Sequence, residues 1–174
     1  DGMRIVVTSP VVREHEAVSS SRLRRVIQRG EIASARRWLG RPAQLYGTVV
    51  RGEGRARQLG FHTANVRLAR DLVQPPHGVY RVWLEVAGRR YQGLMNLGIR
   101  PTFLTRRAAA RRNGPPLVVC EVHLADFHGN LYGRFVTIAL LEWVRPEQRF
   151  AGPEELAQHI RQDLRRAHLL RARR

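Results

Sequence analysis

Six short strand-like runs between residues 45 and 144 most limit the folds open to this chain. The runs cover residues 45–51, 61–67, 78–86, 90–97, 117–125 and 135–144. Turn residues separate them, and no helical period comes between them. Strands of this length with such connections predict a mainly β fold, an antiparallel barrel of six strands. The Ala87-Gly88 turn further predicts that residues 79–86 and 91–97 form a hairpin.

The segment before the strand region has mainly helical patterns. Serines at 19–21 can cap a helix that ends at Gly30. A second short helix is expected over residues 31–39, closed by Gly40. Ahead of both, residues 4–8 read as a short strand. This segment is too short to fold alone, so we expect it to dock on the barrel.

A further helix is expected after the last strand. The stretch Gly152-Pro153-Glu154-Glu155 places proline in the first turn and carboxylates at the positive end of the helix dipole. One apolar stripe should lie on the barrel, and it consists of Leu156, Ile160, Leu164 and Ala167.

Residues 47–65 begin as a strand and then break into a loop rich in glycine and arginine. The loop contains Gly52, Gly54, Gly60, Arg51, Arg55 and Arg57. Glycines let backbone N–H groups approach an anion closely, and arginines add fork-shaped donors. The loop favours a phosphate cradle, although a hairpin with solvated charges has the same composition. It is neither a Walker loop nor a Rossmann fingerprint, because no Gly-Lys-Ser/Thr follows and the next element reads as a strand.

Thr63 and Asn65 follow this loop with the spacing of a strand face. If residues 61–66 are extended, the two side chains point the same way. A hydroxyl and an amide carbonyl are hard oxygen ligands, suited to a Mg²⁺ that arrives with a nucleotide. The strand after the loop is therefore predicted to be half of a metal site.

The charge of the chain points to anionic partners. The formal net charge is +17, and the chain contains no lysine, so every one of these cations is an arginine. Such a balance attracts nucleotides, nucleic acid or acidic surfaces, although a bias toward arginine codons would produce it as well. Because the arginines are spread along the chain rather than gathered beside exposed aromatic residues, we do not expect a dedicated nucleic-acid binder.

Cysteine usage and hydropathy bear on the compartment. Cys120 is the only cysteine, so no intrachain disulfide can form, as in a reducing cytoplasm. No apolar run approaches the length of a membrane helix, and no membrane partner is expected. We therefore expect a cytoplasmic protein.

Four motifs in order carry a family resemblance. They are Leu59-Gly60-Phe61-His62-Thr63-Ala64-Asn65, Met95-Asn96-Leu97-Gly98-Ile99-Arg100-Pro101-Thr102-Phe103, Cys120-Glu121-Val122-His123-Leu124-Ala125-Asp126-Phe127 with Leu131-Tyr132-Gly133, and Val144-Arg145-Pro146-Glu147-Gln148-Arg149-Phe150. Over residues 45–170 they resemble the riboflavin kinase family, most closely the kinase module of bacterial bifunctional riboflavin kinase/FAD synthetases. The resemblance implies a six-stranded Greek-key barrel with a C-terminal helix and a short helical N-terminal extension.

The resemblance also implies a domain organisation. Residues 1–43 look like the end of the adenylyltransferase domain of the bifunctional enzymes, and residues 44–174 like their kinase domain. The kinase domain would be paired with a full adenylyltransferase domain in a longer protein. Because the rest of that domain is absent here, FAD synthetase activity is not expected from this chain alone.

The resemblance implies roles for particular residues. The expected activity is transfer of the γ-phosphate of ATP to riboflavin, giving FMN and ADP, with Mg²⁺ as the metal. The implied metal ligands are Thr63 and Asn65, the implied ATP-binding residues are Gly52, Gly54, Arg57, Gly60 and Thr63, and the implied flavin-binding residues are Asn96, Arg100, Thr102 and Arg145. Glu121 is the implied catalytic base.

Glu121 also suits that role on its own chemistry. Strand alternation places it on one face with Val119 and His123. A carboxylate near a hydroxyl can take its proton, although a strand glutamate can instead pair with one of the many arginines. For His123 a structural role is favoured over a second acid or base.

Three positions depart from the family pattern, one of them Ile99, which stands where threonine is usual. His62 stands where proline would pre-order the ligand strand, and Ala56 stands where the loop usually has another glycine. Because of these departures, one alternative is that the chain is a non-catalytic remnant of a kinase, which binds flavin without turnover. A basic nucleic-acid-binding barrel is the other alternative.

Overall fold

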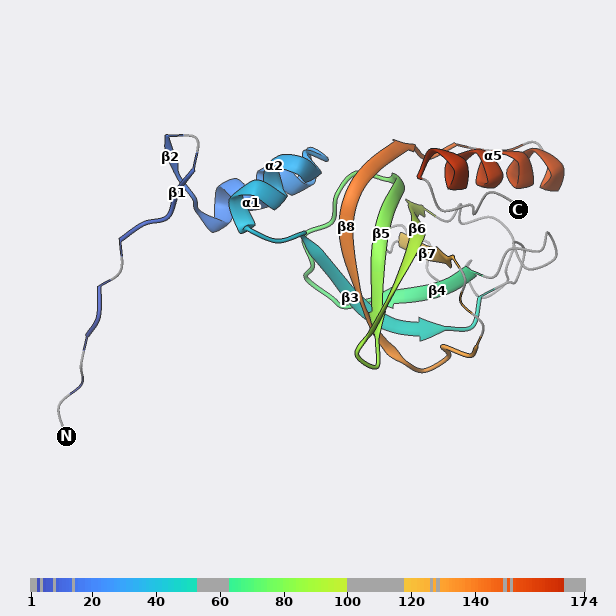
Figure 1. The fold of residues 1–174 in the computed structure, drawn as a ribbon, viewed down its shortest axis with the longest axis horizontal. Helices are drawn as coiled ribbons and strands as arrows, with labels where there is room; N and C mark the ends of the chain where they lie inside the picture. The colour runs from blue at the N-terminus through green and yellow to red at the C-terminus, as the bar shows by residue number, and fades with distance from the viewer. Residues whose placement is uncertain are drawn as a thin grey trace, which may run out of the picture.

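The computed structural model describes residues 3, 5–7, 9–13, 15–52, 63–99, 118–125, 127, 129–148, 150 and 152–167 (Figure 1). Its elements are β1 (Val12–Arg13), β2 (Glu16–Ala17), α1 (Ser20–Gln28), α2 (Ile32–Leu39), β3 (Gln44–Val50), β4 (Thr63–Leu68), β5 (Gly78–Val86), β6 (Arg89–Ile99), β7 (Val118–Leu124), β8 (Phe135–Pro146) and α5 (Pro153–Arg166).

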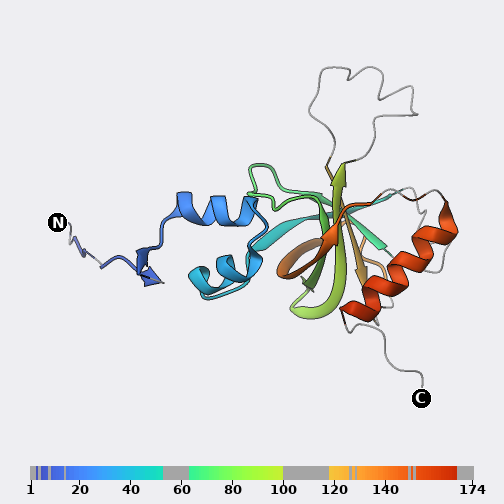
Figure 2. The same cartoon turned by 90° about the horizontal axis from the view of Figure 1, so that it is seen from above.

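Six of the strands close into a barrel in which every pairing is antiparallel. The order around the barrel is β3-β4-β7-β6-β5-β8, and β8 pairs with β3 to complete it. The pairings β4 with β7 and β5 with β8 join strands that are not consecutive in the chain. The predicted mainly β fold, a barrel of six antiparallel strands with a C-terminal helix and a short helical N-terminal extension, is confirmed (Figures 1 and 2).

Alternation along each strand builds the core. In β7 the buried residues are Cys120, Val122 and Leu124, and the residues between them are only half buried. Because successive side chains of a strand point to opposite faces, the buried set fills the barrel and the other set lies on its outer face. Tyr80, the largest side chain of the core, donates its hydroxyl hydrogen to the carbonyl of Pro76 at 2.5 Å.

The predicted hairpin is β5–β6. Its turn residues Ala87 and Gly88 have φ of 49° and 73°. Two successive left-handed residues match the right-handed twist of the flanking strands, which explains the tight two-residue connection.

Helix α5 covers part of the outer barrel face, on the side away from the N-terminal helices (Figures 1 and 2). Ala157 and Leu164 of the helix, with its C-cap Ala167, pack with Val79 and Leu94 of the barrel. The predicted apolar stripe is therefore confirmed for Ile160, Leu164 and Ala167, whereas the Leu156 side chain lies outside the described residues.

The N-terminal helices form where the serine and glycine signals predict. The Ser19 hydroxyl accepts the backbone N–H of Arg22 at 3.3 Å, which caps α1. Gly40 ends α2 with φ of 69°, a left-handed conformation that favours glycine. Ile32 of α2 belongs to the barrel core, so this segment docks as expected.

The strand predicted at residues 4–8 is wrong. Residues 5–7 are exposed and lie outside any strand, whereas Val12–Arg13 and Glu16–Ala17 pair with each other. A β-branched run with no neighbouring strand has no partner for its backbone hydrogen bonds. Among the described residues, no helix has the length and apolar character needed to cross a membrane.

Candidate active site

Three neighbouring strands bring the predicted polar residues into one row. Asn65 on β4 lies opposite Glu121 on β7, and Glu121 lies opposite Asn96 on β6. Residues directly opposite in antiparallel strands have Cβ atoms roughly 4.5–5.5 Å apart and point to the same face. All three side chains are half buried on the outer face of the barrel. A carboxylate and two amides thus converge from three strands far apart in sequence.

Thr63 lies on the same face as Asn65, two residues earlier on β4. Its partner across the ladder is His123, which follows Glu121 by two residues. This register matches two expectations. Thr63 and Asn65 share one face of β4, and Glu121 and His123 share the adjoining face of β7. The hydroxyl and the amide carbonyl are thereby presented side by side.

Gly52 is packed against the Asn65 side chain. A Cβ added at Gly52 would overlap the amide group of Asn65. No other residue type leaves this space, because every other side chain begins with a Cβ. Gly52 thus leaves the space that the Asn65 amide occupies.

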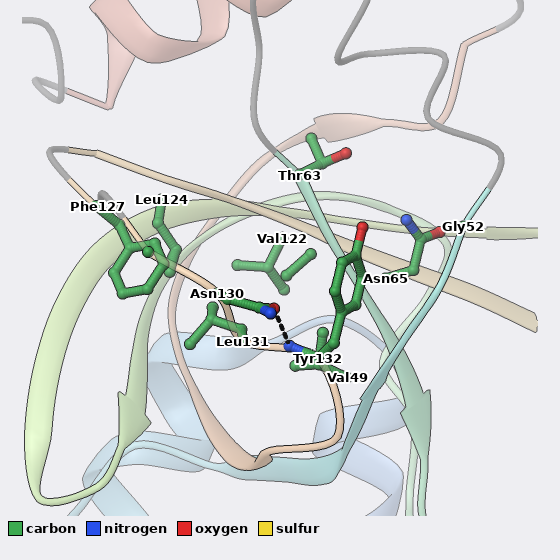
Figure 3. Close-up of a pocket in the computed structure, with 12 residues that line it drawn as sticks. Val49, Gly52, Thr63, Asn65, Val122, Leu124, Phe127, Asn130, Leu131 and Tyr132 are labelled. Carbon is green, nitrogen blue, oxygen red and sulfur yellow. Dashed lines mark hydrogen bonds between the residues drawn. The ribbon is translucent and has the colours of Figure 1, made fainter.

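A cavity of about 340 Å³ adjoins Thr63 and Asn65 (Figure 3). Apolar side chains from the barrel and the 127–132 segment form its walls, and the full lining is Val49, Gly52, Thr63, Ala64, Asn65, Val122, Leu124, Phe127, Gly129, Asn130, Leu131 and Tyr132. A cavity that combines apolar side chains with a small number of polar groups, here Thr63, Asn65, Asn130 and Tyr132, is the usual form of a small-molecule site.

The 130–133 segment shapes this cavity. The backbone N–H of Tyr132 donates to Oδ1 of Asn130 at 2.9 Å (Figure 3), and Gly133 adopts φ of 75°. The Arg51 guanidinium lies 5.9 Å from the centre of the Tyr132 ring. Sequence patterns assign no role to Asn130 or Tyr132, and the Leu131-Tyr132-Gly133 motif is the signal that marks this segment.

Arg145 is held by the C-terminal helix. Its Nε donates to both carboxylate oxygens of Asp163 at 3.0 Å, and its Nη2 donates to Oδ2 at 2.7 Å. The guanidinium also donates to the carbonyl of Pro146 and lies 5.7 Å from the centre of the Phe150 ring. Arg145 lies opposite Val79, which in turn lies opposite Asn96, so it continues the polar row. Its implied flavin contact stays a prediction.

Several predicted site residues lie outside the described residues. These are Gly54, Arg57, Gly60, Arg100 and Thr102, together with two of the departures, Ala56 and His62. Of the implied site, the structure therefore places Gly52, Thr63, Asn65, Asn96, Glu121 and Arg145.

Burial sets the chemistry of Cys120, which lies next to Glu121 in sequence but points into the core. Its removal from water, together with the nearby charge of Glu121, raises the pKa of the Cys120 thiol from its usual 9.0 to about 12. The thiol stays protonated at neutral pH and is a core side chain, not a nucleophile.

The donor set suits a hard cation bound through oxygen. The described part of the chain contains no group of three or more His, Cys, Asp or Glu side chains that could hold a metal. Thr63 and Asn65 instead offer a hydroxyl and an amide carbonyl on one face of β4, with the Asn65 amide beside Gly52. Mg²⁺ is usually bound by a few protein oxygens and completed by waters and substrate phosphates, so this arrangement fits it.

Comparison with known families agrees with this arrangement. The Flavokinase model, described as riboflavin kinase, matches residues 39–170. This chain belongs to the riboflavin kinase family. The match covers the whole barrel and α5, so the family and the fold coincide over the same residues.

Curated relatives carry the family's kinase together with a second activity. A bifunctional riboflavin kinase/FMN adenylyltransferase of Bacillus subtilis is 36% identical over 157 residues, which are 90% of this chain and 48% of that protein. A protein of the same description from Pseudomonas fluorescens is 37% identical over 171 residues, 98% of this chain and 52% of that protein. The chain spans about half the length of the curated relatives it matches.

A solved structure supports the fold. A crystal structure described as the macrolide-efflux protein from Streptococcus pneumoniae superposes with a TM-score of 0.78 at 28% identity. The match covers 93% of this chain and 50% of that one. Assignment to the riboflavin kinase family rests on the family match and the curated relatives.

Proposed function

We propose that this chain transfers the γ-phosphate of ATP to the 5′-hydroxyl of riboflavin, giving FMN and ADP. The observation that carries the proposal is the row Asn65–Glu121–Asn96, in which a carboxylate stands one strand away from the Asn of the ligand strand. Phosphoryl transfer needs a base or orienting group beside the metal and little covalent chemistry, and this row supplies both positions.

Thr63 and Asn65 are the proposed Mg²⁺ ligands. Their oxygens share one face of β4, and Gly52 leaves the space that the Asn65 amide occupies. When bound, Mg²⁺ neutralises charge on the transferring phosphates, a Lewis-acid contribution of several kcal/mol. Because both ligand oxygens are neutral, the cation keeps its charge for the phosphates.

Glu121 is the proposed base. It would accept the proton of the riboflavin hydroxyl as the oxygen attacks the γ-phosphate. Such positioned proton transfer contributes roughly 10²- to 10⁴-fold to the rate. The position of Glu121 between Asn65 and Asn96 supports this role, because the hydroxyl must lie beside the phosphate and beside the base at the same time.

The other implied contacts complete the two substrate sites. For ATP they are Gly52, Gly54, Arg57 and Gly60 in the loop that leads to Thr63, and for riboflavin they are Asn96, Arg100, Thr102 and Arg145. The order of Asn65, Glu121 and Asn96 in the row suggests that ATP lies toward β4 and riboflavin toward β6.

The division of the chain is also proposed. Residues 1–43 would continue from an adenylyltransferase domain in a longer, cytoplasmic protein, with the kinase domain at residues 44–174. The bifunctional relatives support this pairing, because the chain matches about half of each. Conversion of FMN to FAD is not expected from residues 1–174 alone.

The first test is FMN formation by the unmodified chain from riboflavin, ATP and Mg²⁺, with the flavins separated by chromatography. FMN should require both ATP and Mg²⁺. A folded protein that binds riboflavin but forms no FMN would overturn the kinase proposal and favour a flavin-binding remnant.

The second test is the variant Glu121→Gln. We expect kcat to fall roughly 10²- to 10⁴-fold, because the amide cannot take the proton. The melting temperature should stay unchanged, since the side chain is only half buried. Glu142→Gln, on an exposed carboxylate paired with Arg81, is the matched control and should keep full activity. Full activity of Glu121→Gln would refute its role as base.

A further inference from the structure

Glu147 reaches back over the barrel to the strand that carries Asn96. Strand β8 ends at Pro146, and the Glu147 side chain crosses to β6. A Cβ added at Gly98 would overlap the Glu147 carboxylate, so this carboxylate lies directly on the backbone of Gly98. Gly98 has no side chain and leaves the space that the carboxylate occupies.

This contact puts a second carboxylate on the face of the proposed site. Gly98 follows Asn96 by two residues, so both present the same face of β6. Asn96 lies opposite Glu121, and Gly98 lies opposite Val119. Two residues along a strand span about 6.8 Å, so Glu147 lies about one such step from the row of Glu121 and Asn96.

The Glu147 carboxylate is available to a ligand. Its residue is exposed, and within the part of the chain that the structure describes it takes part in no ion pair. The nearby Arg145 guanidinium is directed to Asp163 instead. An ionised carboxylate only accepts hydrogen bonds, so its natural partner is a hydroxyl or N–H donor of the substrate.

We propose that Glu147 accepts a hydrogen bond from an inner ribityl hydroxyl of riboflavin and so selects for the hydroxylated chain. The inference rests on the proposed kinase function, which sets the 5′-hydroxyl beside Glu121. A point about 6.8 Å from that hydroxyl, the spacing of two residues along a strand, lies within the length of the five-carbon ribityl chain. The imide end of the flavin ring is farther from the 5′-hydroxyl than the whole length of this chain.

Such a contact would act on specificity more than on the phosphoryl transfer step. A site built to bond a hydroxyl discriminates strongly against an analogue that lacks it, because its own acceptor is left without a partner. Glu147 is thus a substrate-positioning residue, and Gly98 leaves the space in which its carboxylate lies. Neither had a signal in the sequence beyond its place in two of the four motifs.

The test is Glu147→Ala, with Glu147→Gln as the conservative variant. We expect Glu147→Ala to raise KM for riboflavin about tenfold, the size of a lost charge-assisted hydrogen bond. Values of kcat and of KM for ATP should stay within about twofold, and Glu147→Gln should lie between the two. Glu154→Ala, on an exposed carboxylate of α5, should change nothing. Unchanged riboflavin KM in Glu147→Ala would overturn the proposal.

A substrate analogue distinguishes a contact to the ribityl chain from a contact to the flavin ring. The 10-(5-hydroxypentyl) flavin keeps the ring and the terminal hydroxyl but lacks the inner hydroxyls. Its KM, or its inhibition constant against riboflavin, should be the same within about twofold in wild type and Glu147→Ala. If the variant weakens this analogue as much as riboflavin, Glu147 contacts the ring and the assignment to the chain is wrong.

Gly98→Ala tests the same geometry without touching the carboxylate. Its methyl group should displace Glu147 and reproduce the riboflavin effect in a protein with an unchanged melting temperature. Failure of the kinase proposal is distinguishable, because the wild type would then form no FMN. Riboflavin affinity, measured by quenching of flavin fluorescence, would still compare wild type with Glu147→Ala and decide the role of Glu147.

Discussion

The two ends of one row of side chains on the barrel are built in different ways. At one end, Asn65, Glu121 and Asn96 lie opposite one another on three strands and are half buried. At the other end, Val79 and Arg145 are covered by α5, and Arg145 is bound to Asp163 of that helix. Strand register places every member of the row, whereas the covering helix decides which polar groups remain available.

The difference is one of burial around charge. The Arg145 and Asp163 side chains are 12% and 5% exposed, and three of their N···O contacts are 3.0 Å or shorter. A charge that is removed from water must keep its partner, whereas a half-buried Glu121 can exchange a partner for substrate. We therefore expect the covered end, Val79 and Arg145 under α5, to stabilise the fold. The open end, Asn65, Glu121 and Asn96, is expected to perform the proposed chemistry.

The largest effect on stability should follow from Asp163→Ala. This variant leaves the Arg145 guanidinium buried without its carboxylate, which typically costs about 3–5 kcal/mol. Urea denaturation would measure the loss in free energy of unfolding. A change below about 1 kcal/mol would show that the pair does not fasten α5 to the barrel.

Two controls sharpen this prediction. Glu142→Ala breaks the exposed pair with Arg81, whose side chains are 38% and 60% exposed, and should change stability by less than about 1 kcal/mol. Replacing both partners, with Arg145→Met and Asp163→Leu together, should recover much of the loss, since no charge is left buried. If the double variant is as unstable as Asp163→Ala, packing rather than charge holds the helix.

The open end could be predicted from sequence because strand patterns carry it. Alternation alone put Thr63 with Asn65, and it set Glu121 apart from Cys120. The family resemblance added which strands carry the ligands and the base. Strand periodicity also predicted every barrel strand, although β6 and β8 each run two residues beyond their predicted ends at Leu97 and Val144.

The covered end could not be predicted, because its contacts cross from a helix to a strand. Asp163 reads as a polar position on a helix, and only the packing of α5 shows that it faces Arg145. The contact of the Glu147 carboxylate with Gly98 likewise depends on how the chain turns after Pro146. The wrong strand at residues 4–8 has the same origin, since a β-branched pattern does not reveal whether a partner strand exists.

A moderate effect confined to the open end should follow from Gly52→Ala. Its methyl group would push the Asn65 amide aside, and we expect this displacement of a metal ligand to cost about 10- to 100-fold in metal affinity, as does the loss of a group that orients one. A Mg²⁺ titration of FMN formation at fixed ATP would measure the shift. The melting temperature should hold, because Gly52 is exposed.

The matched control for this change is Gly152→Ala, where a Cβ would meet nothing within 4 Å. That variant should leave the Mg²⁺ requirement unaltered. An unshifted Mg²⁺ requirement in Gly52→Ala would show that Asn65 is not a metal ligand. The Asn65 side chain would then have only a structural role.

The smallest effect concerns the core behind Glu121 and appears only at alkaline pH. Because the folded-state pKa of Cys120 is raised from 9.0 to about 12, its contribution to stability is complete below pH 9 and is lost as pH rises toward 12. In that window the unfolded chain releases a proton that the folded chain retains, a change of about 1.4 kcal/mol per pH unit. Urea denaturation between pH 7 and 11 would measure the slope.

Cys120→Ala removes this titration and supplies the comparison. The variant should be less stable at pH 7 because of the cavity it leaves, but the gap to wild type should narrow above pH 9. Burial also raises the pKa of the Tyr80 hydroxyl above its usual 10.0, so both proteins should still lose stability above pH 10. A gap that stays constant from pH 7 to 11 would mean that the Cys120 thiol titrates alike in the folded and unfolded chains, and the core behind Glu121 would then be wetter than its packing indicates.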